Sequence, residues 1–148
     1  MRNCLVSRTA IAVLTVCFFA AAPLGCSKSS GAPAEAAAEA PPAAPAFDGW
    51  VIQSNDVVPR AKIDEIEARL GGKIKALRNV VYQVNGRKIQ VNVIAARDAT
   101  EADNVHRGLL KTKASWSVVR KGVVVYELVG PNEAMEDMKK ARDELNTQ

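Results

Sequence analysis

The chain of 148 residues carries 20 Lys or Arg and 16 Asp or Glu, which gives a formal net charge of +4 at pH 7. Its charged residues are interspersed without a long run of one sign, so they are typical of a solvated surface and give no basic footprint for nucleic acid. The three cysteines, Cys4, Cys17 and Cys26, all precede residue 27, which excludes a disulfide within the rest of the chain.

The first 25 residues have the pattern of a signal peptide. Arg2 and Arg8 form a basic start without an acidic residue, and 10–22 is a nearly unbroken apolar run. A transmembrane helix needs about 20 apolar residues, so this run is too short to span a bilayer comfortably. The pattern predicts an exported protein.

The signal region ends in Pro23-Leu24-Gly25-Cys26. With Gly25 and Cys26 this segment resembles the lipobox of bacterial lipoprotein precursors, in which diacylglycerol is attached to the cysteine that becomes the new N-terminus. The resemblance implies lipidation of Cys26 and attachment to a membrane through that lipid. With Ser27 after the cysteine, it also implies the outer membrane of a cell envelope, facing the periplasm. Cleavage after Ala22 without lipidation is the alternative.

Residues 26–46 are rich in Ala and Pro and contain no large apolar side chain. Such a segment cannot bury enough surface to offset the entropy of folding. We therefore predict three parts: a signal peptide at 1–25, a disordered lipid-anchored tether at 26–46, and a single domain at 47–148.

The domain opens with a weak strand signal at 50–53. Pro59 then favours the start of a helix, and Gly71 favours its end because glycine is the usual residue just past a helix C-terminus.

Asn85-Gly86 follows, between apolar-rich strands expected at 73–84 and 87–96. Both positions of a two-residue hairpin turn of this kind need positive φ, which Asn and Gly tolerate. This is the strongest hairpin signal in the chain.

Asp98 and Glu101 have the spacing of a capping pair at the start of a second helix, and Asn132 is expected to cap a third. Between these helices, strands are expected at 115–120 and 123–129 around a turn at Lys121-Gly122.

The resulting order is β-α-β-β-α-β-β-α, which predicts an α+β fold. We expect a ferredoxin-like two-layer arrangement, with an antiparallel sheet in the spatial order 2-3-1-4-5 and the helices on one face.

The second hairpin is apolar on both faces. Val119, Val123 and Val125 alternate away from the other apolar residues of the hairpin, so a one-sided helix layer would leave them exposed. We predict that these valines form an interaction surface for an unknown envelope protein or for a second copy of the chain. Coverage of the valines by the C-terminal helix is the alternative.

Two basic pairs, Arg87-Lys88 and Arg120-Lys121, lie at the hairpin turns and are candidates for contact with an anion. The predicted topology places the two turns at opposite ends of the sheet, so the two pairs are not expected to form one anion site. The favoured interpretation is that each pair keeps its own turn from associating with other chains.

No motif for catalysis or metal binding stands out. His106 is the only histidine and the predicted domain has no cysteine, so no metal or cofactor is expected. Ser54, Ser115 and Ser117 have only His106 to serve as a base, and the sequence has no Gly-x-Ser-x-Gly elbow, which disfavours nucleophilic catalysis.

The acids Asp64, Glu65 and Glu67 have the spacing of surface ion pairs on a helix. The favoured function is a non-enzymatic binding module tethered to the envelope. The alternatives are a self-associating structural component and a small carboxylate-dependent enzyme.

Overall fold

The computed structural model describes residues 40–148. The predicted signal peptide, Cys26 and the first part of the predicted tether lie outside the described residues. Within residues 40–148, none of the helices combines the length and the apolar character that a membrane span requires.

The described chain forms five strands and three α-helices, in the predicted order and in the predicted α+β class. In sequence they are β1 (Val51–Val57), α1 (Arg60–Leu70), β2 (Ile74–Val84), β3 (Arg87–Ala96), α2 (Ala99–Leu110), β4 (Val118–Lys121), β5 (Val124–Val129) and α3 (Met135–Thr147). Short 3-10 turns precede β4 and α3.

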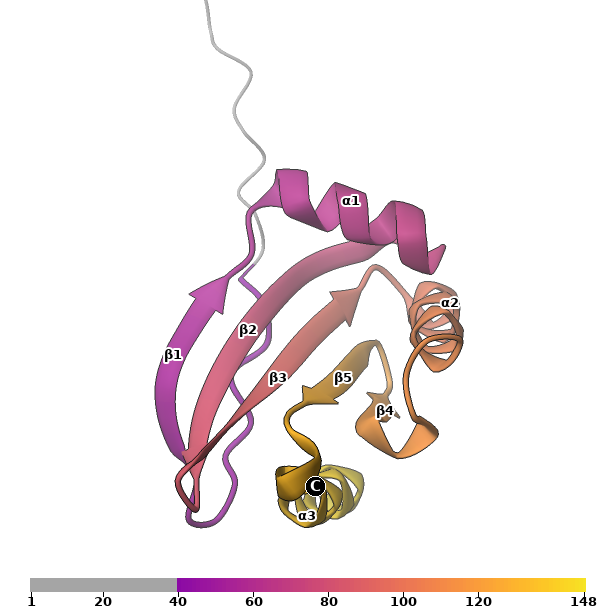
Figure 1. Cartoon of the computed structure of the whole chain (residues 1–148). Coiled ribbons are helices and arrows are strands. Elements are labelled where there is room, and N and C mark those ends of the chain that lie inside the picture. Colours follow the sequence, from indigo (N-terminus) through magenta and orange to yellow (C-terminus); the bar gives the residue numbers. More distant parts are fainter. Residues whose placement is uncertain (1–39) are drawn as a thin grey trace, which may run out of the picture. The chain divides into compact units, whose positions relative to one another are not determined.

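The five strands form one antiparallel sheet in the order β1-β2-β3-β5-β4, so the ferredoxin-like order 2-3-1-4-5 is wrong. The error concerns the first strand, which pairs antiparallel with β2 at the edge of the sheet. Figure 1 shows the reason: α1 crosses the end of the strands, and the chain returns beside β1 instead of crossing over. The second strand-helix-strand unit, β3-α2-β4, is as expected. Because β3 and β4 both pair antiparallel with β5, they run in the same direction.

The sheet is covered on both faces, and not on one as predicted. Successive side chains of a strand point to opposite faces. Accordingly, Val91 and Val93 of β3 pack in one apolar cluster with α3. Ile94 and Ala96 pack in a second cluster with α1 and α2. In Figure 1, α1 and α2 lie together and α3 lies apart from them.

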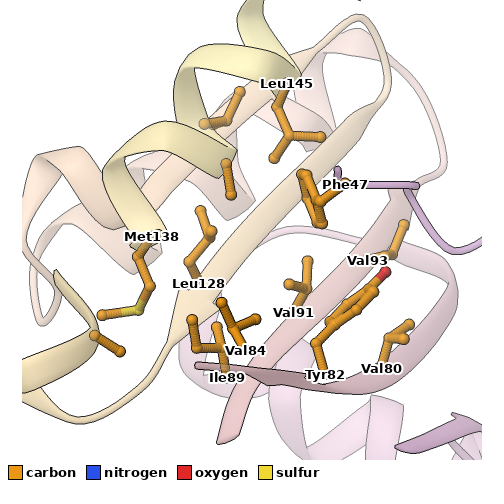
Figure 2. Close-up of a cluster of buried hydrophobic side chains, with 13 residues drawn as sticks. Phe47, Val80, Tyr82, Val84, Ile89, Val91, Val93, Leu128, Met138 and Leu145 are labelled. Carbon is orange, nitrogen blue, oxygen red and sulfur yellow. The ribbon is translucent and has the colours of Figure 1, made fainter. Parts of the chain in front are cut away.

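Residues 40–50, which we call the strap, share the α3 face of the sheet. The hydroxyl of Tyr82 donates a hydrogen bond of 2.6 Å to the carbonyl of Pro45, and burial raises the pKa of Tyr82 to about 12, so this hydroxyl remains a donor. Arg78 Nε donates to the carbonyl of Pro42 at 3.1 Å. Phe47 lies among the buried side chains of the sheet and α3 (Figure 2).

The tether prediction is therefore wrong for residues 40–46. These residues bring proline rings and free carbonyls to a surface of aromatic and basic side chains, and Pro41 and Pro45 are buried. Ala/Pro composition indicates a segment that cannot fold alone, but not whether it docks on an existing sheet.

Both hairpin turns have two residues. Asn85 and Gly86 adopt positive φ of 47° and 78°, as predicted. The second turn consists of Gly122 and Val123, because Lys121 pairs with Val124, and it is one residue later than predicted.

The two predicted helix caps have different outcomes. Asp98 accepts a hydrogen bond of 2.9 Å from the backbone N–H of Glu101, so the capping prediction for α2 is confirmed. Asn132 does not cap α3, because a 3-10 turn precedes the helix and α3 begins at Met135 without a side-chain cap.

Candidate functional site

The three valines predicted as an interaction surface do not form one. Val119 is 4% exposed and packs in the cluster that contains α3, whereas Val125 is fully buried in the cluster that contains α1 and α2. Val123 alone is exposed, at 44%, in the turn. The prediction is wrong because helices cover both faces of the hairpin.

The two basic pairs are also separate, as the topology argument expected. Arg87 follows the turn at one end of β3 and lies 3.8 Å from Asp137 of α3. Arg120 forms an ion pair of 2.9 Å with Asp103 of α2, and β5 begins beside Ala95 at the other end of β3. Lys88 and Lys121 follow these arginines at the two ends. The four cations do not form one anion site.

A groove of about 530 Å³ lies instead between α1, α2 and the sheet, and we call it the α1–α2 groove. Small-molecule sites typically have volumes of about 300–1,000 Å³. The groove is built from residues of α1, the segment after α2, and strands β2, β3 and β5, which are distant in sequence. No local pattern in the sequence predicted this groove.

A chain of polar side chains lies on the sheet floor of the groove. Gln90 donates to Asn92 at 2.6 Å, and Asn92 donates to Glu127 at 2.8 Å. Asn92 and Glu127 are direct partners across β3 and β5. Lys113 forms an ion pair of 3.0 Å with the other oxygen of Glu127, so the charge of this buried acid is compensated.

Asn79 of β2 extends this polar row, since it pairs with Asn92 across β2 and β3. Its side chain is half-buried, lines the groove, and has no hydrogen-bond partner within the part of the chain that the structure describes. Asn79 therefore offers a donor and an acceptor to a bound molecule.

The walls of the groove are apolar. Leu77 and Ile94 contribute from the sheet, Ile66 and Leu70 from α1, and Leu109 from α2. Leu77, Ile94 and Leu109 are already buried. The apolar surface open to a bound molecule comes from Ile66 and Leu70, which are half-buried, and from Val129 of β5, which is 37% exposed.

Gly108 sets the spacing of the two helices. A Cβ atom at this position would lie 2.4 Å from the carbonyl oxygen of Leu70, which is far inside van der Waals contact. The backbones of α1 and α2 can approach this closely only because residue 108 has no side chain.

Two cations, Lys62 and Arg69, line the α1 side of the groove. Glu65 lies within one helical turn of each of them, at the spacing of a helix ion pair. Neither cation forms an ion pair with it or with any other group among residues 40–148. Their charge is available to a molecule in the groove.

A second polar cluster, which we call the Glu67 clamp, joins α1 to β2. Glu67 is 7% exposed and accepts hydrogen bonds from Arg60 at 2.7 Å, from Lys73 at 2.9 Å and from the backbone N–H of Ile74 at 2.8 Å. Burial acts to raise the pKa of Glu67, but these hydrogen bonds outweigh it and lower the pKa to about 2. Because both oxygens are occupied and the group is ionised at neutral pH, the clamp is structural.

No group of three or more metal-ligating side chains occurs within residues 40–148, and His106 is half-buried on α2. The chain matches no protein-family model, no curated protein and no solved structure.

Proposed function

We propose that the chain is a non-enzymatic binding protein of the cell envelope, tethered by lipid on Cys26, and that its ligand site is the α1–α2 groove. The observation that carries the proposal is the combination of apolar walls with an unpartnered amide and two unpaired cations in one groove of small-molecule size. Such a combination is characteristic of recognition sites, in which apolar contacts supply affinity and a few polar groups fix orientation.

The chemistry of the groove favours binding over catalysis. Among residues 40–148, Glu127 is the only acid in the lining, and its oxygens are engaged by Lys113 and Asn92. Within residues 40–148 the lining contains no His, Cys or Ser, and its one hydroxyl side chain, Thr112, donates to the carbonyl of Leu109 at 3.4 Å and not to a base.

A single-cysteine reporter tests the binding site. The mature chain, residues 26–148, carries no thiol once Cys26→Ser is introduced. Thr112→Cys then places a solvatochromic dye at the groove, and Thr147→Cys places it at the end of α3 on the other face. We expect solvent extracts of envelopes to shift the emission of the dye at position 112 and not at position 147. If neither dye responds, the groove is not a ligand site.

The tether is tested separately. In cells given a radioactive fatty acid, we expect label on the native chain and none on the Cys26→Ser variant, because Cys26 is the only thiol after the predicted cleavage site. Unlabelled native protein would exclude lipidation.

Self-association is the second candidate function, and β1 favours it. This strand has one neighbour in the sheet, and Val51, Ile52 and Val57 are 60%, 47% and 56% exposed. Exposed apolar edge strands are templates for pairing with another chain.

Light scattering distinguishes this candidate from the first. If β1 pairs with a second copy, Val57→Lys makes the protein monomeric, whereas Met135→Lys, at an exposed methionine on α3, leaves the mass unchanged. A native chain that is already monomeric at about 100 μM, far above the Kd of a stable dimer, excludes a structural role through this edge.

A further inference from the structure

We infer that the ligand of the α1–α2 groove is an amphipathic organic anion, in which an apolar chain ends in one carboxylate or phosphate group. This inference rests on the proposed function and names the chemical class of the ligand. Three features of the groove support it: the apolar walls, the balance of charge, and the position of the free amide.

The walls select for an apolar body. Ile66 and Leu70 of α1 are half-buried in the lining, and Val129 of β5 is 37% exposed. Removal of apolar surface from water is favourable in proportion to its area, so a ligand without an apolar part would leave the exposed parts of these three side chains hydrated. A small inorganic ion therefore does not account for the site.

The charges select for an anionic head group. In the described part of the chain, the lining contains the cations Lys62, Arg69 and Lys113, but only one acid, Glu127. Lys113 lies 3.0 Å from Glu127, so these two charges compensate each other. Lys62 and Arg69 remain, without an ion pair in the described part of the chain. A cationic head group would meet uncompensated positive charge, whereas an anion would be attracted to it.

The free amide completes the polar side of the site. Asn79 lies on the sheet floor, half-buried, and its amide N–H groups have no acceptor in residues 40–148. Carboxylates and phosphates are acceptors for both amide and guanidinium donors. The groove thus presents donors to a head group and apolar side chains to a tail.

The test uses the mature chain with Cys26→Ser and the fluorescent probe 11-(dansylamino)undecanoic acid, with its methyl ester as the matched neutral probe. We expect the acid to bind and the ester to bind at least about tenfold more weakly. The double variant Lys62→Gln, Arg69→Gln should lower the affinity for the acid about tenfold, the effect of losing two partly exposed ion pairs, and should not change the affinity for the ester. Raising the salt from about 20 to 500 mM should reduce the difference between acid and ester.

Control variants on the other face of the sheet make the result specific. Lys140→Gln, Arg142→Gln removes one lysine and one arginine from α3 and should leave binding unchanged. Val129→Trp adds a large side chain to the groove at a partly exposed lining position and should abolish binding, whereas Thr147→Trp, at the end of α3, should not. Dodecanoate and dodecyl phosphate should displace the probe, and the stronger competitor identifies the head group.

Three results would overturn the inference. The first is equal affinity for the acid and the ester, and the second is displacement of the probe by neutral dodecanol as effective as that by dodecanoate. The third is an unchanged affinity for the acid in the Lys62, Arg69 double variant. If the dye at position 112 responds to envelope extracts but the acid probe does not bind, the ligand class is wrong and the binding function stands. If the dye does not respond and the acid probe does not bind, both the proposed binding function and the ligand class are wrong.

Discussion

Glu67 illustrates how a carboxylate that the sequence pattern places on the surface can be buried in the structure. Helical spacing predicts surface ion pairs on α1, but Glu67 pairs with Arg60, seven residues before it, and with Lys73 beyond the helix. Spacing along a helix cannot reveal that the chain turns at Gly71 and returns the N–H of Ile74 to the same carboxylate. Glu67 is therefore ion-paired, but it is buried, and its partners are not the helix neighbours that the spacing predicted.

The Glu67 clamp predicts a pH-dependent contribution to stability. Because the folded pKa of Glu67 is lowered to about 2, from an ordinary value of 4.5, the clamp stabilises the fold above pH 4.5 and loses this contribution as the pH falls toward 2. We expect Glu67→Gln to lower the free energy of unfolding by roughly 3 kcal/mol at pH 7, and by much less at pH 2.

Urea denaturation at pH 7, 4.5, 3 and 2 measures this difference. The matched control is Glu65→Gln, at an exposed acid of the same helix with no ion pair among the described residues. An equal loss of stability at every pH would mean that the clamp acts through shape and not through charge.

At the scale of elements, local signals predicted the chain order and both hairpins, but not which layer covers each strand face. The second hairpin shows why. Residues that pair directly across antiparallel strands share a face of the sheet. Val119 pairs with Tyr126, and Val125 pairs with Arg120, so the two valines point to opposite faces. Grouping them required an assumption about the turn, and the turn lies one residue later than assumed.

The α1–α2 groove could be predicted only in part. Gln90 and Asn92 alternate with buried residues along β3, which shows that one half of a sheet face is polar. Nothing local in the sequence indicates that Lys62, Arg69 and Lys113 converge on those amides, because their proximity depends on how α1 and α2 pack.

The close packing of α1 against α2 predicts that Gly108→Ala destabilises the fold, whereas helix propensity alone predicts that it stabilises the fold. In a solvated helix, Gly→Ala stabilises by about 1 kcal/mol. In Gly108→Ala the new methyl group meets the Leu70 carbonyl, so we expect a loss of about 2–4 kcal/mol in the free energy of unfolding and a change in the groove. Chemical denaturation measures the first effect, and a lower affinity for the dansyl acid measures the second. A stabilised variant would show that the helices separate without cost.

At the scale of the whole described molecule, the sheet separates two surfaces. The α1–α2 groove occupies one face, whereas the strap and α3 cover the other. The segment through which the chain enters the domain therefore does not occupy the groove. This division lets the strap contribute to stability without competing with a ligand.

The last prediction concerns the strap and uses a double-mutant cycle. Tyr82→Phe removes the hydroxyl that donates to the Pro45 carbonyl, and a chain that begins at residue 47 removes the carbonyl itself. In a chain that begins at residue 40, we expect Tyr82→Phe to lower the free energy of unfolding by about 1–2 kcal/mol, as for a buried hydrogen bond. In the shorter chain the substitution should cost nearly nothing, because its partner is absent.

Tyr126→Phe is the control, since the half-buried Tyr126 has a hydroxyl without a hydrogen-bond partner within residues 40–148. It should have the same small effect in both chains. The shorter chain itself should be less stable by about 1–3 kcal/mol, because it loses the buried rings of Pro41 and Pro45 and two hydrogen bonds to their segment. If both chains unfold at the same denaturant concentration, residues 40–46 contribute nothing to the fold, and the domain begins at Phe47 as its composition suggested.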